Sequence, residues 1–434
     1  MSHGTGGRRV VDVEGLARVE GEGSLHVELH DGTVTGVRLE IFEPPRYFEA
    51  MLVGRNFTEA PDITARICGI CPVAYQMSAC AAMEDACGVT VSEPIRRLRR
   101  LLYCGEWIQS HALHVYLLHA PDFLGCADAV ELAGVDRGAV ERGLRIKKTG
   151  NLVMETVGGR AVHPVNVRVG GFYSAPDPAA VAALVDPLRA ARDDAVRTVE
   201  WVAGFDFPDV AAPYRFVALR GADRYPIEAG RVGSSDGLDL SPAEFADLVV
   251  EEHVERSTAL HARLGGRDEY LTGPLARYAL NADLLPAVAA GAARQAGLGD
   301  RCTNPFRSIV VRAVELVAAC DEAVALAEAY VPPDPPAVPV APRAATGTGA
   351  TEAPRGLLFH QYDIDAAGTI RRARIVPPTS QNQLTIEADL RRVAQGAVDL
   401  GDDALRWRCE QAVRNHDPCI SCAAHFLDIT VVSS

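Results

Sequence analysis

Four cysteines, arranged as two Cys-x-x-Cys pairs, are the residues of this chain best suited to chemistry. Cys68 and Cys71 form the first pair, and Cys419 and Cys422 form the second, near the other end of the sequence. Pro72, directly after the first pair, is favoured at the first position of a helix, and a helix N-terminus stabilises a thiolate relative to a thiol. The first pair is therefore expected to present two metal-binding or redox-active sulfur atoms.

The second pair lies in a similar local sequence. Asp417 can cap the N-terminus of a short helix, and Pro418 fits the first position of that helix. Cys422 and His425 are three residues apart, so they would share one face of it. We therefore expect both pairs to lie at helix starts.

A zinc site with four cysteine ligands and a thioredoxin-like redox pair are the alternative interpretations. The chain has eleven cysteines, an odd number that argues against a disulfide framework. Structural zinc sites usually take both pairs from one short segment, whereas Cys419 lies 348 positions beyond Cys71. Neither pair lies in an evident β-α-β pattern, which weakens the thioredoxin-like interpretation.

Seven motifs in order along nearly the whole chain resemble those of the nickel-iron hydrogenase large subunit. Five of them accompany the two cysteine pairs, and they are Arg18–Gly21, Glu43–Glu49, Gly159–Pro164, Ala353–Gly356 and Val376–Asn382. The resemblance implies that Cys68 and Cys419 are terminal nickel ligands, and that Cys71 and Cys422 bridge nickel to an iron carrying carbon monoxide and cyanide. Soft thiolates suit both metals.

The same resemblance implies a catalytic proton path. H2 would be split heterolytically, with a terminal cysteine thiolate such as Cys419 as the base and Glu20 as the next proton carrier. Taken alone, Glu20 resembles an ordinary solvated turn carboxylate. Gly21 and Gly23 beside it permit close backbone approach, which suits the relay role once the metal motifs are present.

Further residues around the metals are assigned by the resemblance. Arg355 would lie over the open side of the site and bond a cyanide, Thr379 would bond another, and Pro354 would pack nearby. Asp122 would pair with Arg355, and Asp417 would be a second supporting carboxylate. An arginine suits this place because its planar donors do not titrate, and a surface cation beside a proline-rich segment is the alternative interpretation of Arg355 from the local sequence.

A magnesium ion is the second cofactor that the resemblance implies. Glu49, the backbone carbonyl of Ile375 and His425 would bind it, although a histidine ligand is unusual for magnesium. Other histidines and cysteines are expected to be buried core residues, namely His111, His114, His119, Cys80, Cys87, Cys104, Cys126, Cys302, Cys320 and Cys409.

At two positions the sequence resembles members of the cytoplasmic, bidirectional branch of the family, which couples hydrogen to NAD(P). Glu22 and Tyr75 stand where many uptake-type members carry histidines. The sequence has no glycine-rich nucleotide fingerprint and no further cysteine spacing for iron-sulfur clusters. We therefore expect an iron-sulfur small subunit and flavin-containing diaphorase subunits as partners. A deazaflavin acceptor, or a non-catalytic zinc-tetrathiolate scaffold, remains the alternative.

Composition and the two ends of the chain add further expectations. A net charge of −14 over 434 residues argues against nucleic acid or anionic lipid as a partner. We expect a cytoplasmic protein with no signal peptide and no membrane span. Residues 426–434 lie beyond the histidine at which mature family members end, so a maturation protease is expected to remove them.

The predicted fold is α+β and mostly helical, with a long central helix bundle, a small N-terminal antiparallel sheet and peripheral strands. Alternating residues over 10–41 predict a β-hairpin around Asp31 and Gly32. Helices are predicted over 72–87, 94–120, 178–204, 241–264 and 307–330. The expected segments are 1–60 (β-rich), 61–330 (helical core), 331–354 (a proline-rich connection without a packed element), 355–425 (second cysteine pair) and 426–434.

Overall fold

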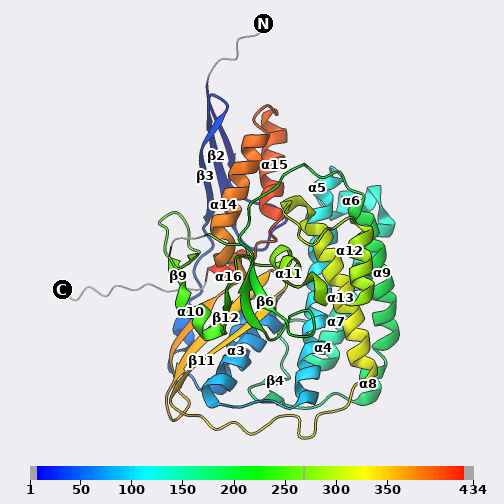
Figure 1. The fold of residues 1–434 in the computed structure, drawn as a ribbon, viewed down its shortest axis with the longest axis vertical. Helices are drawn as coiled ribbons and strands as arrows, with labels where there is room; N and C mark the ends of the chain where they lie inside the picture. Colours follow the sequence, from blue (N-terminus) through cyan, green and yellow to red (C-terminus); the bar gives the residue numbers. More distant parts are fainter. Residues whose placement is uncertain (1–6, 267–268, 425–434) are drawn as a thin grey trace, which may run out of the picture.

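A bundle of long helices lies beside several small antiparallel sheets (Figure 1). The computed structural model describes residues 7–266 and 269–424. The bundle consists of α4 (Glu93–Leu113), α7 (Arg137–Gly158), α9 (Val185–Ala203) and α13 (Ser308–Glu328). Shorter helices at its ends and sides are α5 (Ala120–Phe123), α6 (Ala129–Val135), α8 (Pro178–Ala182), α11 (Pro274–Asn281) and α12 (Ala287–Gln295). The predicted α+β class, with a central bundle, is confirmed.

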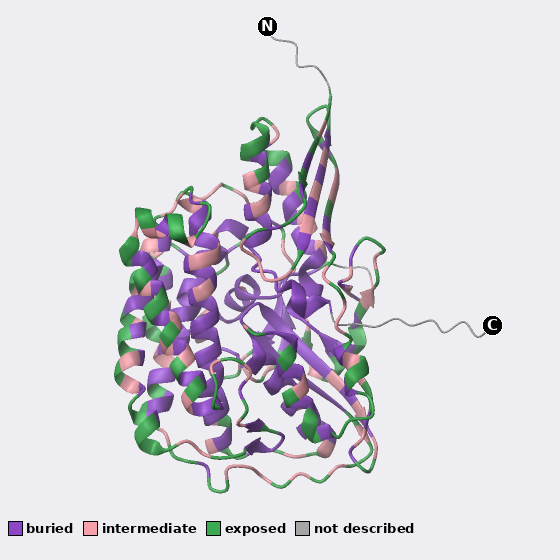
Figure 2. Ribbon diagram, turned by 180° about the vertical axis from the view of Figure 1, so that it is seen from behind, coloured by how far each residue is buried: buried purple, intermediate pink, exposed green. Residues whose placement is uncertain are grey.

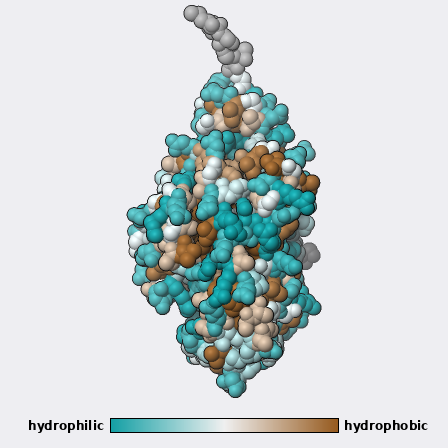
Figure 3. Space-filling view, turned by 90° about the vertical axis from the view of Figure 1, so that its right-hand side faces the viewer, coloured by the Kyte–Doolittle hydropathy of each residue, from teal (hydrophilic) through white to brown (hydrophobic). Residues whose placement is uncertain are grey.

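The innermost bundle helix, α13, is buried along almost its whole length, from Ser308 to Ala327. Outer helices such as α7 and α9 bury one face and expose the other (Figure 2). On the face shown in Figure 3, hydrophobic side chains form separate patches among hydrophilic ones. Within the described ranges, no helix is both long and apolar enough to cross a bilayer.

The predicted N-terminal hairpin is present as β2 (Gly23–His30) and β3 (Thr33–Ile41), and β1 (Arg8–Val13) adds a third antiparallel strand. Asp31 and Gly32 form its turn with positive φ, as the sequence pattern requires. Helices α14 (Pro378–Gly396) and α15 (Asp402–Arg414) pack against this sheet and bury its apolar face. The C-terminal helices that precede the second cysteine pair are thereby packed against the N-terminal sheet.

A second three-stranded sheet has the order β11-β12-β13, with β11 at Ala345–Ala353, β12 at Gly356–Ile364 and β13 at Ile370–Val376. Helix α3 (Pro72–Cys87), which begins at the first cysteine pair, packs directly on β11. A side chain at Gly349 would put its Cβ 2.6 Å from the carbonyl oxygen of Ser78. The prediction that 331–354 contains no packed element is therefore wrong for Ala345–Ala353, because the glycines of this strand allow it to lie against a helix.

The helix predicted over 241–264 is also wrong beyond its first turns. A capping box at Ser241 and Glu244 starts α10 (Pro242–Leu248), but the chain then forms β9 (Val249–Glu252) and β10 (His261–Leu264). Val249 and Leu264 pair across this hairpin and pack into an apolar cluster with β12. Tertiary packing of β-branched residues overrides the helical pattern here.

The other predicted helices are present, but the one predicted over 178–204 is divided into α8 and α9, and α4 continues through a π-helical segment, His114–His119, to α5. Peripheral strands were predicted without positions, and the remaining ones are β4 (Val167–Arg168), β5 (Gly171–Phe172), β6 (Val217–Arg220), β7 (Arg231–Ser234) and β8 (Asp239–Leu240). Short helices near the cysteine motifs are α1 (Phe48–Leu52), α2 (Ala60–Thr64) and α16 (Ile420–Ala423).

Candidate metal centre

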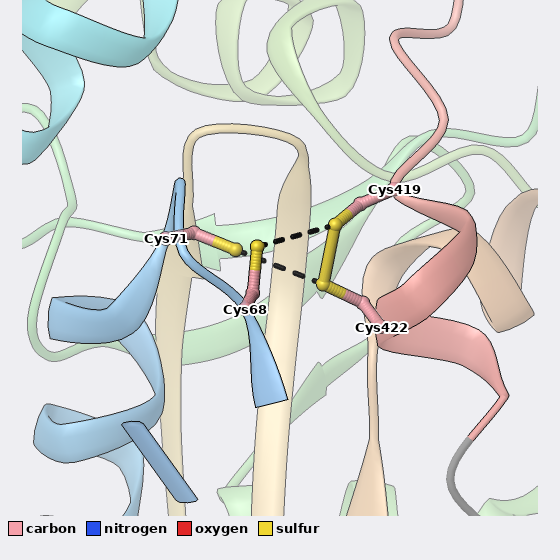
Figure 4. Close-up of side chains that lie close together, drawn as sticks. All are labelled: Cys68, Cys71, Cys419 and Cys422. Carbon is pink, nitrogen blue, oxygen red and sulfur yellow. Dashed lines mark hydrogen bonds between the residues drawn. A yellow bond between two sulfur atoms is a disulfide. The ribbon is translucent and has the colours of Figure 1, made fainter. Parts of the chain in front are cut away.

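The two cysteine pairs meet in the protein interior (Figure 4). One ligand atom from each of Cys68, Cys71, Cys419 and Cys422 lies within 4.8 Å of the other three. All four residues are buried, with at most 3% of their surface exposed. The Sγ atoms of Cys68 and Cys419 are 3.5 Å apart, and those of Cys71 and Cys422 are 3.8 Å apart. Two segments from opposite ends of the chain thus build one four-sulfur site.

Each pair lies at the start of a helix, although the second differs from the predicted construction. Cys71 is the N-cap residue of α3 and Cys419 that of α16, and neither helix has a side-chain cap from its own N-cap residue. The prediction that Asp417 caps the second helix is wrong, because Asp417 has a positive φ and turns its side chain toward Arg355. The structure joins Cys419 and Cys422 as a disulfide, which must be reduced before either can bind metal.

Glu106 caps the helix that follows the first pair. This fully buried carboxylate on α4 accepts the backbone N–H groups of Val73 (2.6 Å) and Ala74 (3.1 Å). Burial raises the pKa of Glu106 well above its usual value, although the two backbone bonds oppose the change. Glu106 therefore fixes the first turn of α3 directly behind Cys71.

Arg46 connects the two cysteine loops. Its Nη2 donates to the carbonyl oxygen of Ile67 at 2.7 Å and also to that of Ser421. Its backbone N–H donates to the carbonyl of Ala424 at 3.0 Å. One guanidinium thus holds the residues that precede Cys68 and Cys422.

Glu20 lies against the second pair. Its Oε2 lies 3.1 Å from Cys419 Sγ and accepts the backbone N–H of Ser421 at 3.1 Å. The Ser421 hydroxyl donates to Glu43 Oε2 at 2.9 Å. Glu43 is partly exposed, so this chain of polar groups extends from a cysteine sulfur toward the surface.

Arg355 and Asp417 form a buried ion pair beside the four sulfurs. Arg355 Nη2 is 3.2 Å from Asp417 Oδ1, and Arg355 Nε donates to the Asp417 carbonyl at 3.0 Å. Burial alone would lower the pKa of Arg355, but Asp417 and the thiolates of Cys71 and Cys68 raise it. The hydrogen bond with Cys71, helped by the charge of Arg355, lowers the pKa of Cys68.

The predicted pairing of Asp122 with Arg355 is wrong. Asp122 accepts two hydrogen bonds from Arg414, at 2.7 and 2.8 Å, and a third from Arg18 at 2.6 Å. Both carboxylate oxygens are therefore occupied by other arginines, and Asp417 takes the place of Asp122 beside Arg355.

Comparison with known proteins identifies the family. The sequence profile described as nickel-dependent hydrogenase matches residues 46–142. Sulfhydrogenase 1 subunit alpha of Pyrococcus furiosus is 33% identical over 423 residues, which cover 96% of this chain and 97% of that protein. The chain belongs to the nickel-dependent hydrogenase large-subunit family.

Other members of this hydrogenase family are similar over almost their whole length. The beta subunit of the NAD-reducing hydrogenase HoxS of Cupriavidus necator is 26% identical, covering 96% of this chain and 95% of that subunit. A crystal structure of an NAD+-reducing [NiFe]-hydrogenase in the H2-reduced state superposes with a TM-score of 0.86 at 28% identity, covering 96% and 99%. A [NiFeSe]-hydrogenase from Dm. baculatum, at 22% identity and a TM-score of 0.78, shares the fold.

The donor set of this hydrogenase chain fits a nickel-iron centre. Four thiolates suit nickel and iron, and the buried Nη1 and Nη2 of Arg355 make no hydrogen bond within the described part of the chain. Asp417 Oδ2 likewise has no hydrogen-bond partner there. Buried polar atoms are normally satisfied, so these atoms point to a polar group at this place.

The predicted residues around Cys419 divide into those that contact its loop and those that do not. The Thr379 hydroxyl accepts the backbone N–H of Cys419 at 2.9 Å, so Thr379 directly holds a predicted ligand. The Pro354 carbonyl instead accepts a hydrogen bond from Arg277 at 2.9 Å. The predicted cyanide contact of Thr379 stays a prediction.

Two of the three predicted magnesium ligands, Glu49 and Ile375, lie within the described residues. Glu49 Oε1 accepts the backbone N–H of Ile375 at 2.6 Å, so these two residues are adjacent, and His425 lies outside the described residues. Burial raises the pKa of Glu49 to about 7. A partly buried carboxylate whose charged form is disfavoured suits a divalent cation, which would stabilise the charged form.

The remaining histidines and cysteines behave largely as predicted. His111, His114 and His119 are fully or almost fully buried, and His111 Nε2 lies 3.1 Å from Glu315 on α13. The other predicted core cysteines are buried except Cys87, which is partly exposed. These residues are core histidines and cysteines.

Several residues of the site escaped the sequence reasoning, namely Glu43, Arg46, Glu106, Arg277 and Ser421. Glu43 and Arg46 lie inside a recognised motif, and Ser421 lies between two predicted ligands, so proximity was their only signal. Glu106 is a single acidic residue in an apolar stretch of α4, which is the usual sign of a buried charge with a specific partner.

Proposed function

We propose that this chain catalyses reversible heterolytic cleavage of H2 at a nickel-iron centre whose iron carries carbon monoxide and cyanide. Cys68 and Cys419 would be terminal nickel ligands, and Cys71 and Cys422 would bridge the metals. The meeting of all four sulfurs within 4.8 Å of one another supports a four-thiolate centre, and the division into terminal and bridging ligands rests on the resemblance of the two cysteine motifs. When bound, the centre supplies the open coordination position at which H2 is polarised.

The chain's own residues would then move the proton. Cys419 Sγ would accept it and pass it over 3.1 Å to Glu20 Oε2. From there the Ser421 hydroxyl and Glu43 provide the next polar groups toward solvent. Arg355 cannot take this proton, because a buried guanidinium beside Asp417 remains charged.

The 3.1 Å contact between Cys419 and Glu20 is the observation that carries this proposal. A zinc-tetrathiolate scaffold needs only the four sulfurs. It gives no reason for a carboxylate against a ligand sulfur, or for the buried Nη1 of Arg355, which has no hydrogen-bond partner among the described residues.

A second cation and removal of the C-terminal residues complete the proposed site. Glu49, the Ile375 carbonyl and His425 would bind magnesium. Residues 426–434 would be removed by a maturation protease after nickel insertion, which would leave His425 as the last residue.

An iron-sulfur small subunit is proposed to receive the electrons. Gly69, between the first two cysteines, is exposed, and Val162 lies next to it with 51% of its surface exposed. Val165 and Tyr173, which follow in the same region, are 42% and 55% exposed. Exposed apolar side chains beside a buried redox site are expected to lie in an interface.

Transfer from that subunit through a flavin-containing module to NAD(P), in the cytoplasm, completes the proposal. It is supported by similarity to the NAD-reducing HoxS subunit and to the NAD+-reducing structure. The deazaflavin alternative predicts a complex that reduces deazaflavin with H2 and leaves NAD(P) unchanged.

Infrared spectroscopy of the complex, purified anaerobically from its own host, tests the site. We expect stretching bands of metal-bound carbon monoxide and cyanide, an intact mass lacking residues 426–434, and H2-dependent reduction of NAD+ or NADP+. Bands without reduction of either nucleotide would overturn only the proposed acceptor. Absence of bands from a chain already cleaved after His425 would overturn the nickel-iron assignment and favour zinc.

A further inference from the structure

Arg277 on α11 is a fully buried arginine that donates hydrogen bonds to two carboxylates and to two backbone carbonyls. Its Nε and Nη2 each donate to an oxygen of Glu315 at 2.7 Å, and its Nη1 donates to Glu352 at 3.0 Å. The guanidinium also lies 4.5 Å from the centre of the Trp107 ring. Its orientation is therefore fixed by two carboxylates and an aromatic face.

The same guanidinium holds the backbone that leads into Arg355. Nη1 donates to the carbonyl of Ala353 and Nη2 to that of Pro354, both at 2.9 Å. These are the two peptide groups directly before Arg355. Both terminal nitrogens of Arg277 are thus shared between a carboxylate and the loop that carries the arginine beside the four sulfurs.

Residues just before α11 support the other side of this loop. The Thr272 hydroxyl accepts the backbone N–H of Leu357 at 2.7 Å. A side chain at Gly273, where φ is +111°, would put its Cβ 2.7 Å from the carbonyl oxygen of Arg355. The loop is therefore held on both sides of Arg355 by residues 272–277.

Stability alone does not explain this arrangement. Buried ion pairs are often no more stable than well-packed apolar residues, because both charges lose their hydration. Arg277 lowers the pKa of Glu315 to about 2 against the effect of burial, so this carboxylate is charged and keeps the guanidinium in place. The hydrogen bonds to the Ala353 and Pro354 carbonyls are the part of the network that contacts the loop of Arg355, beside the four sulfurs.

We infer that Arg277 is a positioning residue that aims the Arg355 guanidinium at the nickel-iron centre by holding the Ala353 and Pro354 carbonyls. This inference rests on the proposed function. Arg277 itself lies behind the loop and acts only through Arg355.

Arg277→Lys is the first variant to measure, because a single ammonium group cannot make the paired bonds to Glu315 and both carbonyl bonds together. We expect nickel content near that of the wild type, shifted cyanide bands, and a 10- to 100-fold fall in kcat for H2 oxidation, about the effect of a small misplacement. Arg355→Lys should shift the bands in the same direction.

Arg99→Lys is a matched control. Arg99 is also buried, makes paired bonds to Glu84 at 2.6 and 2.9 Å, and donates to the Arg168 carbonyl; among the described residues it makes no hydrogen bond to the loop of Arg355. It should lower stability while leaving the infrared bands unchanged. The double variant Arg277→Lys/Arg355→Lys should be no less active than Arg355→Lys, because both changes act on one guanidinium.

Two results would overturn the inference. One is unchanged bands in Arg277→Lys, and the other is activity losses that add in the double variant. If Arg277→Lys binds no metal, Glu315→Gln loosens the guanidinium more mildly and should shift the bands in the same direction, and unchanged bands there also overturn the inference. Absence of bands from the wild type would instead overturn the proposed function.

Discussion

The guanidinium of Arg355 contacts both the side chain and the backbone of Asp417, with Nη2 3.2 Å from Oδ1 and Nε donating to the carbonyl oxygen at 3.0 Å. Asp417 lies two residues before Cys419, so the guanidinium is tied to the loop that supplies half of the sulfur atoms. A change in either residue alters where the positive charge stands relative to the thiolates.

Replacing Arg355 with lysine keeps a positive charge but removes the planar guanidinium group and its fixed N–H donors. We expect kcat for H2 oxidation to fall about 100- to 1,000-fold, as for removal of a fixed donor from a catalytic site, with nickel content unchanged. Hydrogen-dependent dye reduction by the purified complex measures the effect. Arg372→Lys, at an exposed position of β13, is the control, and equal activity in the two variants would contradict the proposed role.

Replacing Glu20 with glutamine removes the carboxylate that is proposed to accept the proton from Cys419, while keeping the size of the side chain. We expect H2/D2O isotope exchange to fall by about 100-fold or more, the usual effect of losing a general base, with the infrared bands retained. Exchange needs no electron acceptor, so it isolates the proton step. Glu22→Gln changes an exposed carboxylate two residues away and should exchange like the wild type.

Replacing Ser421 with alanine keeps the backbone N–H bond to Glu20 and removes only the hydroxyl bond to Glu43. If the hydroxyl carries the proton onward, exchange should fall by about tenfold, less than in Glu20→Gln, which loses the general base itself. Full exchange activity in Ser421→Ala, with Glu20→Gln inactive, would mean that the proton leaves Glu20 by another route.

Replacing Cys68 with serine removes one soft thiolate from the four-sulfur cluster. We expect loss of nickel and of all hydrogen activity, because a hydroxyl is a poor ligand for nickel. Cys80→Ser is the control, since Cys80 is buried on α3 away from the cluster and should keep its nickel. Elemental analysis of the anaerobically purified complex measures the nickel content. A Cys68→Ser variant that retains nickel would contradict the assignment of Cys68 as a nickel ligand.

The sequence predicted the four cysteines because their types, spacing and neighbouring motifs are local properties. It placed Glu20, Arg355 and Asp417 near them, and the structure brings all three to the site. It failed at Asp122, because the motif does not show which arginine reaches that carboxylate. Arg414 and Arg18 do so only once α15 packs beside the N-terminal segment.

The role of Arg277 was beyond sequence reasoning for the same reason. Its partners Glu315, Glu352 and Pro354 come from α13, β11 and the following turn, and no spacing along the chain relates them. The strand β11 was missed because glycine and threonine after a proline-rich run resemble a linker. Its order comes from packing against α3, which only the folded chain provides.

His261 on β10 makes folding sensitive to acid. Burial lowers its pKa to about 4, against the opposing effect of Glu387, and neither ring nitrogen has a hydrogen-bond partner within the described residues. The unfolded chain binds a proton at this histidine below about pH 6.5, whereas the folded chain does so only near pH 4. Stability is therefore complete above pH 6.5 and falls as the pH drops toward 4.

Replacing His261 with leucine removes this proton-binding difference at a site where the imidazole makes no hydrogen bond. The free energy of unfolding of the wild type should fall by about 3 kcal/mol relative to His261→Leu between pH 6.5 and 4, since each pKa unit contributes about 1.4 kcal/mol. Urea unfolding of the large subunit at several pH values measures the difference. His30→Leu, at an exposed histidine, should follow the wild type, and parallel pH profiles for His261→Leu and the wild type would show that His261 is not the acid-sensitive group.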